Sequence, residues 1–150
     1  MNIIQKVIYN FIQSDTYINT TIHYDMNTIK IRLHENQSKE RYVYFYIYSP
    51  WRITKNGIFI SSSDLYTHED ELEDQSKYEE TFAQYVKATE YLLKHKIVDI
   101  KIKSESTDLV IQWADGTLLE SFGLNPDEWS YHIYDKLNEK TYDVFYGRIS

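Results

Sequence analysis

The sequence predicts an α+β fold whose strands pair mostly antiparallel, and two observations lead to that class. Apolar residues recur at the spacing of a helix in two separate segments. Most of the remaining chain alternates apolar and polar residues with the period of a strand, and short polar segments connect neighbouring runs, which favours antiparallel pairing. Helices that stand apart from runs of strands are typical of α+β rather than parallel α/β proteins. We therefore expect about eight to nine strands, an N-terminal helix and one central amphipathic helix.

The length and composition fit one domain. The chain has 150 residues, of which 42% are hydrophobic and 26% are charged, close to the values of globular proteins. A second hydrophobic core would need a longer chain. Residues 1–150 are therefore expected to form a single α+β domain.

Two segments carry the helical pattern. Residues 2–13 place their isoleucines, Val7 and Phe11 on one face, which predicts an amphipathic helix that docks on the domain. Residues 76–95 keep a second apolar stripe, with acidic residues in the first turn and basic residues in the last, as the helix dipole favours.

Runs of alternating residues predict the strands. Before the central helix these runs cover residues 17–24, 28–34, 41–49, 51–54 and 58–62, and after it they cover 97–103, 109–113, 117–122, 129–135 and 141–146. Asn56-Gly57 and Asp115-Gly116 are both typical of hairpin turns. A two-residue turn at Asp115-Gly116 would pair Trp113 with Leu118, but it would also place Glu120 on the apolar face. Either Glu120 lies near a sheet edge, or the turn is longer.

The composition excludes several kinds of chemistry. Without cysteine there is no disulfide, thiol nucleophile, zinc ribbon or iron–sulfur cluster. The four glycines are isolated, so no glycine-rich loop is present to hold a phosphate. The N-terminal segment lacks the pattern of a signal peptide, and no apolar run approaches the ~20 residues of a membrane span. We expect a cytoplasmic protein.

Two further clusters contain residue types that are used in catalysis and metal binding. Ser61-Ser62-Ser63, followed by Asp64 and His68, is the nearest arrangement to a serine hydrolase, but it lacks the glycine-flanked turn that presents a nucleophile. The acidic run that begins at Glu69 lacks the spacing and central glycine of a calcium loop. We therefore expect no catalytic residue, no metal and no cofactor.

Four tyrosines alternate with apolar residues in the strand predicted at 41–49. Val43, Phe45 and Ile47 share one face of that strand, and the opposite face carries the residues that we call the tyrosine stripe: Tyr42, Tyr44, Tyr46 and Tyr48. The commoner arrangement covers such a strand on both sides, for example with the N-terminal helix. The alternative is an exposed aromatic platform for a protein, a sugar or a base.

Residues 64–80 are strongly acidic and lie within a chain of net charge −7. Such a segment steers basic partners by electrostatic attraction, or it serves solubility alone. The residues that we expect to steer a partner are Asp70, Glu71, Glu73 and Asp74.

Two patches together resemble a known group of proteins. One is Ser49-Pro50-Trp51-Arg52-Ile53, followed by Asn56-Gly57-Ile58, and the other runs from Asp108-Leu109-Val110-Ile111-Gln112-Trp113 through Asp115-Gly116-Thr117-Leu118 to Phe122 and Trp129. This pattern resembles small bacterial proteins whose genes often accompany polymorphic toxins and which are presumed immunity proteins. The resemblance spans roughly residues 42–135 and leaves the N-terminal helix unexplained. It implies a non-catalytic inhibitor that binds a toxin domain stoichiometrically and blocks its active site.

The expected function is therefore protein binding, with a basic partner such as a toxin domain and with the tyrosine stripe as anchors. We expect no direct contact with nucleic acid or membrane, since a net charge of −7 repels phosphates. Three alternatives stay open: a small-molecule or sugar-binding module that uses the tyrosines, a hydrolase built around His68, and a homodimer whose interface is the tyrosine stripe.

Overall fold

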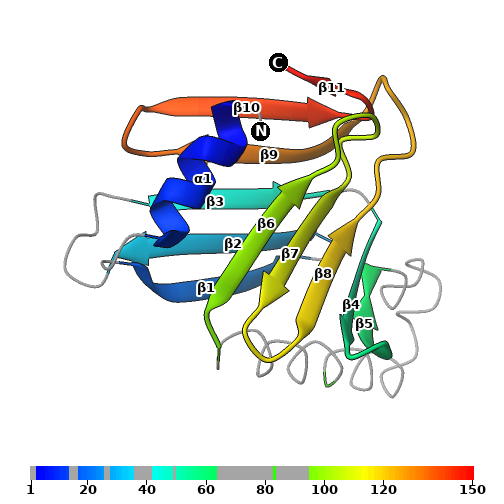
Figure 1. Ribbon diagram of the computed structural model, residues 1–150. Coiled ribbons are helices and arrows are strands. Elements are labelled where there is room, and N and C mark those ends of the chain that lie inside the picture. Colours follow the sequence, from blue (N-terminus) through cyan, green and yellow to red (C-terminus); the bar gives the residue numbers. More distant parts are fainter. Residues whose placement is uncertain are drawn as a thin grey trace.

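Two antiparallel sheets and one helix make up the part of the chain that the structure, a computed structural model, describes (Figure 1). That part comprises residues 3–13, 17–25, 28–35, 42–48, 50–63, 83 and 95–150. The predicted central helix lies outside it except for residues 83 and 95, and so does the acidic segment from Asp64 to Glu80. No helix within the described ranges is long and apolar enough to cross a membrane.

The six-stranded sheet combines strands from both halves of the chain. Its strand order is β1 (Tyr17–Asp25), β2 (Thr28–Glu35), β3 (Tyr42–Ile47), β9 (Trp129–Asp135), β10 (Lys140–Phe145) and β11 (Arg148–Ile149). The junction between the halves is the antiparallel pair β3–β9, which places Tyr44 opposite Tyr134 and Tyr46 opposite His132.

The five-stranded sheet packs against the first. Its strand order is β5 (Ile58–Ser62), β4 (Trp51–Lys55), β8 (Thr117–Ser121), β7 (Leu109–Trp113) and β6 (Ile97–Ile102). Figure 1 shows that the strands of the two sheets run at a marked angle to each other. Apolar side chains from both sheets belong to one buried cluster, in which Trp51, Trp113, Phe45 and Tyr131 are the largest members.

The helix α1 (Ile3–Gln13) lies in the same layer as the five-stranded sheet. It contacts β6 and β1, and in Figure 1 it lies in front of the six-stranded sheet. Ile4 and Ile8 are buried in the shared core, one turn apart on the same face of the helix. The amphipathic N-terminal helix predicted from the sequence is thus confirmed, and it covers the inner face of the six-stranded sheet.

The fold class is confirmed in its main feature, which is a mostly antiparallel sheet structure, and the described residues contain one short helix, α1. The strand count differs, because the described residues form eleven strands rather than about eight to nine: each of the ten alternating runs named above forms a strand of its own, and β11 is the eleventh. The short C-terminal strand β11 had no clear signal, since two residues are too few to show an alternation.

The hairpin at Asp115-Gly116 has the longer turn, which is one of the two possibilities that the sequence left open, and not the two-residue turn. Leu119 lies opposite Ile111 and Leu118 opposite Gln112, so the loop contains three residues and Trp113 faces Thr117. Gly116 has φ +87°, the left-handed position that a three-residue hairpin loop requires. The longer turn moves Glu120 to the outer face of the sheet, where it pairs with Arg52 at 3.1 Å.

A matched pair of glycine variants tests this turn geometry. Gly57 and Gly116 both have positive φ, but a Cβ on Gly57 meets nothing within 4 Å, whereas one on Gly116 lies 2.6 Å from Asn56 Oδ1. We expect Gly57→Ala to lower the free energy of unfolding by about 1–2 kcal/mol, the cost of a left-handed non-glycine residue, and Gly116→Ala to lower it further. Urea denaturation measures both values.

A second experiment repeats Gly116→Ala in a protein that also carries Asn56→Gly, which removes the side chain that the new Cβ would clash with. In that background the cost of Gly116→Ala should fall to that of Gly57→Ala. An unchanged cost would show that the close approach to Asn56 does not determine the tolerance of this turn.

Candidate functional site

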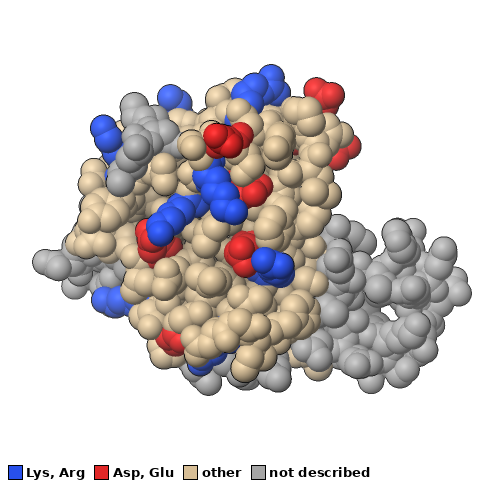
Figure 2. Space-filling model, turned by 45° about the vertical axis from the view of Figure 1, so that its right-hand side comes forward, with Lys and Arg blue, Asp and Glu red and all other residues tan. Residues whose placement is uncertain are grey.

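The outer faces of the two sheets differ in chemistry. The outer face of the five-stranded sheet carries ion pairs: Arg52 with Glu120 at 3.1 Å, Lys101 with Asp99 at 3.4 Å, and Lys103 with Asp108 at 3.9 Å. Figure 2 views the molecule from this side and shows basic and acidic side chains next to one another rather than in separate patches. Alternating charges of this kind are typical of a sheet face in contact with water.

The outer face of the six-stranded sheet is aromatic instead. Val43, Phe45 and Ile47 are fully or almost fully buried on the inner side of β3, so the tyrosines between them point outward. Strand β9 adds rings beside them through its pairing with β3. We call the resulting surface the aromatic face, and its members are Tyr42, Tyr44, Tyr46, Tyr48, Trp129, His132 and Tyr134.

The rings of the aromatic face form two clusters of contacts, one at each end of the face. At one end Tyr44 has its ring centroid 6.1 Å from Tyr42 and 5.1 Å from Tyr134. At the other end Tyr48 lies 4.7 Å from Tyr46 and 5.1 Å from His132, and Trp129 lies 5.0 Å from His132. These separations are those of favourable aromatic pairs. The neighbours therefore hold each ring in place.

Basic side chains from β2 cover the Tyr42 end of the aromatic face. The Arg32 guanidinium lies 4.0 Å from the centroid of the Tyr42 ring, and Lys30 Nζ lies 4.4 Å from that of Tyr44. Both distances suit cation–π attraction. Lys136 lies at the same end, where Tyr134 and then Glu139 raise the pKa of its ammonium group.

An acidic residue lies at the opposite end. Asp143 Oδ1 is 2.6 Å from Nδ1 of His132, and β10 places Asp143 directly opposite His132. Burial, followed by the nearby Tyr46, Tyr44 and Asp143, raises the pKa of Tyr48 above its usual value. Burial, Tyr42 and Tyr134 likewise raise the pKa of Tyr44. Both phenols therefore stay protonated at neutral pH and are able to donate hydrogen bonds.

The predicted anchors lie together on this surface. Tyr42, Tyr44 and Tyr46 are half-buried, mainly by one another and by their neighbours, and Tyr48 is exposed. The helix α1 packs on the inner face, so this helix does not cover the tyrosine stripe. The predicted steering residues Asp70, Glu71, Glu73 and Asp74 lie outside the described residues.

Several members of the aromatic face were not predicted from the sequence. Tyr134, His132 and Trp129 belong to a strand that was expected, but its pairing with β3 joins positions that lie far apart in the chain. The alternation in residues 129–135 marks His132 and Tyr134 as lying on one face of their strand, which was the available signal. Which strand pairs with β3 is decided by the tertiary structure.

The serine cluster is described only in its three serines, of which Ser62 is half-buried. Ser61 and Ser63 are buried, and Ser63 Oγ accepts a hydrogen bond from Trp51 N at 3.0 Å. The remaining members of that cluster, Asp64 and His68, lie outside the described residues. Among the residues that are described, no group of three or more histidines and carboxylates is arranged to hold a metal ion.

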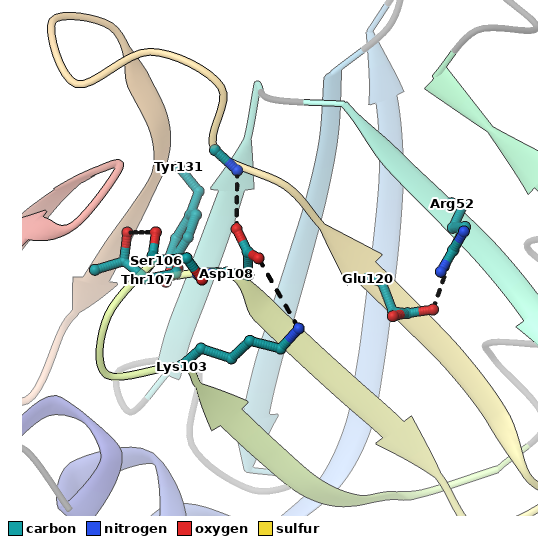
Figure 3. A network of polar contacts seen from close by, with 8 residues as sticks. Arg52, Lys103, Ser106, Thr107, Asp108, Glu120 and Tyr131 are labelled. Atoms are coloured by element: carbon teal, nitrogen blue, oxygen red, sulfur yellow. Dashed lines mark hydrogen bonds and ion pairs between the residues drawn. The ribbon is translucent and has the colours of Figure 1, made fainter.

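A polar cluster links the two sheets, and Figure 3 shows part of it. Thr107, in the loop between β6 and β7, bonds through its hydroxyl to the Phe145 carbonyl and accepts Gly147 N at 3.1 Å. Its own carbonyl accepts the hydroxyl of Tyr131 at 2.8 Å. We call this group the Thr107 clasp, and it holds the strand β9 that carries His132 and Tyr134.

The clasp also includes a strained backbone position and a carboxylate. Thr107 has φ +62°, which is unfavourable for a β-branched residue and is kept only where surrounding contacts compensate. Asp108 Oδ1 accepts Gly123 N at 3.1 Å, next to the ion pair with Lys103. Because these groups satisfy one another, we assign the clasp a structural role.

A scan against models of protein families and searches of curated proteins and of solved structures give no match to this chain. The function therefore has to be argued from the geometry of the aromatic face.

Replacing Tyr131 tests the clasp. Tyr131 is fully buried, and burial, together with the negative charge of Asp108, raises the pKa of its phenol far above the usual value. The folded state therefore opposes ionisation of Tyr131. The stability that depends on the neutral phenol is complete below the unfolded pKa of about 10 and is lost progressively at higher pH.

Tyr131→Phe should lower the free energy of unfolding at neutral pH by about 1–3 kcal/mol, because the Thr107 carbonyl loses its donor. The variant should also lose less stability than the wild type between neutral pH and high pH. Denaturation curves across that range measure both effects, with the exposed Tyr146→Phe as a control. Equal alkaline losses in wild type and Tyr131→Phe would contradict the assignment.

Proposed function

We propose that this protein is a non-catalytic protein-binding module that docks its partner on the aromatic face. The observation that carries the proposal is the contrast between the two sheets of one molecule. One outer face bears interleaved ion pairs suited to water, and the other bears seven aromatic rings that pack in two clusters. An aromatic outer face is costly to leave in water and useful in an interface.

The residue types on the aromatic face favour a protein as the occupant. Tyrosine, tryptophan and arginine are the residues that contribute most often to the energy of protein–protein contacts. Their neighbours already hold the tyrosine rings in place, so binding immobilises few additional rotamers. The phenol hydroxyls supply polar contacts, which sugars and bases also use, but the total charge of −7 disfavours nucleic acid.

The charge of the molecule favours a basic partner. A net charge of −7 attracts a basic protein over a long range and speeds its association, as in complexes of basic nucleases with acidic inhibitors. The narrower proposal is that the partner is a bacterial toxin domain and that this protein is its immunity-type inhibitor. That narrower proposal rests on the sequence resemblance described above.

The residues that carry this resemblance have a framework role in the structure. Trp51, Ile53, Leu109, Ile111 and Trp113 are buried between the sheets on β4 and β7. These residues would support a framework common to the proteins that the sequence resembles. The specificity for a particular partner would lie in the aromatic face and in the acidic residues from Asp70 to Asp74.

Paired surface variants test the docking surface. The double variant Tyr44→Ala/Tyr134→Ala removes two adjoining rings from the aromatic face without touching the core. The control Val110→Ala/Gln112→Ala changes the outer face of the five-stranded sheet. Partners captured from nuclease-treated native cells are purified and titrated against each protein by calorimetry.

We expect a one-to-one complex that the control retains and that the tyrosine variant weakens by about 2 kcal/mol or more, roughly thirtyfold. Equal binding by both variants would remove the aromatic face as the docking surface. Binding of single-stranded oligonucleotides with the same dependence on Tyr44 and Tyr134 would contradict a protein partner. Self-association that is lost in the tyrosine variant would indicate a homodimer instead.

A further inference from the structure

Some rings of the aromatic face have a basic side chain of the protein stacked over them in a cation–π contact, and others do not. Arg32 lies over Tyr42 and Lys30 lies over Tyr44, so at that end the protein satisfies the negative ring faces with its own side chains. At the other end, no basic side chain of the described residues lies over Tyr48 or Trp129. Within the described residues, the chain's own cations therefore lie over the rings at the Tyr42 end and not over those at the Tyr48 end.

The two rings at this other end, those of Tyr48 and Trp129, are also the most accessible members of the aromatic face. Trp129 is 55% exposed and Tyr48 is 40% exposed, whereas the other two tryptophans, Trp51 and Trp113, are buried between the sheets. The centroids of the Tyr48 and Trp129 rings are 6.5 Å apart, with His132 next to both. An exposed tryptophan beside an exposed tyrosine is an effective surface for stacking a flat cation.

A carboxylate lies beside these rings. Asp143 is partly exposed, and its charge reaches Tyr48, whose pKa it contributes to raising. Nδ1 of His132 contacts Oδ1 of Asp143 at 2.6 Å, which fixes the orientation of the carboxylate. The bond to His132 uses Oδ1 of this partly exposed carboxylate, and among the described residues no side chain donates a hydrogen bond to Oδ2, the oxygen that a partner would reach.

We propose that the corner formed by Tyr48, Trp129 and Asp143 binds an arginine side chain of the partner. A guanidinium stacks on an aromatic ring and at the same time donates to a carboxylate, which a compact ammonium does less well. The proposal rests on the proposed function, because it names the chemistry that a basic protein partner presents to the aromatic face. A phosphate group is disfavoured here, because Asp143 repels it.

A peptide pair tests the corner without the partner. The probe is the blocked peptide Gly-Arg-Gly, and the matched control replaces arginine by citrulline, which has the same shape but no charge. The readout is the indole N–H signal of Trp129 in two-dimensional NMR spectra, with the buried Trp51 and Trp113 signals as internal references.

We expect the arginine peptide to shift the Trp129 signal in a saturable way, while the Trp51 and Trp113 signals stay in place. The citrulline peptide should bind several-fold more weakly, because it lacks the charge that both the ring and Asp143 attract. Equal shifts with the two peptides, or no shift with the arginine peptide, would overturn the proposal.

Two variants assign the binding to the corner. Trp129→Leu keeps apolar bulk but removes the ring, and Asp143→Asn keeps the shape but removes the charge. The His132 signal serves as the readout for Trp129→Leu, which lacks the indole. Each variant should weaken the binding of the arginine peptide about two- to fivefold. The control Lys101→Ala, on the opposite sheet, should leave the affinity for this peptide unchanged.

The same variants separate this proposal from the docking surface as a whole. If the partner depends on Tyr44 and Tyr134 but binds equally to wild type and Asp143→Asn, the aromatic face stands and the arginine corner is wrong. If the arginine peptide binds at Trp129 but the affinity for the partner is the same in every variant of the aromatic face, the corner binds guanidinium and the proposed function is wrong.

Discussion

Strand β3 can bury only one of its two faces in the hydrophobic core, and the arrangement of the surface residues depends on which face that is. Val43, Phe45 and Ile47 are almost completely buried between the sheets, and burial of such side chains contributes about 1.5–3 kcal/mol each. A shift of one residue would expose all three and turn the tyrosines inward. The core therefore determines that Tyr42, Tyr44 and Tyr46 point outward, where β2 and β9 add Arg32, Lys30 and Tyr134 around them.

The constraint on β3 extends to β9 through the clasp. Tyr131 lies opposite Ile47 with its ring in the core, and its hydroxyl donates to the carbonyl of Thr107 in the loop that joins β6 and β7 of the other sheet. Because adjacent residues of a strand point to opposite faces, fixing Tyr131 inward also fixes His132 outward beside Asp143. The strained backbone of Thr107 and the inaccessible phenol of Tyr131 therefore support the position of surface residues that they do not touch.

Local patterns predict the helix and strands of this fold well, because a few consecutive residues are enough to show an apolar–polar alternation or a helical repeat. The segments 28–34, 97–103 and 109–113 lie within a residue of β2, β6 and β7. The Asn56-Gly57 turn is confirmed, since Lys55 pairs with Ile58 and both turn residues have positive φ. Asp115-Gly116 shows the limit of such signals, because the same dipeptide serves loops of two or three residues, which place Leu118 on opposite faces.

The candidate site is only partly readable from the sequence. The tyrosine stripe is a local pattern, but whether it is covered depends on where α1 packs, and Ile4 and Ile8 direct that helix to the inner face. The association of Trp129 and Asp143 with Tyr48 requires the pairing of β3 with β9 and of β9 with β10. These contacts join distant parts of the chain, and no short segment encodes them.

The most direct test of the central claim is a footprint of the free protein and of its complex, obtained by hydroxyl-radical labelling and mass spectrometry. In the free protein, Tyr48 and Trp129 should be labelled readily, while Trp51 and Trp113 should be labelled slowly, in accordance with their burial. In the complex, labelling should fall in residues 42–48 and 129–135 and stay unchanged in residues 109–113. Protection confined to the five-stranded sheet, with the tyrosines labelled as in the free protein, would contradict the account.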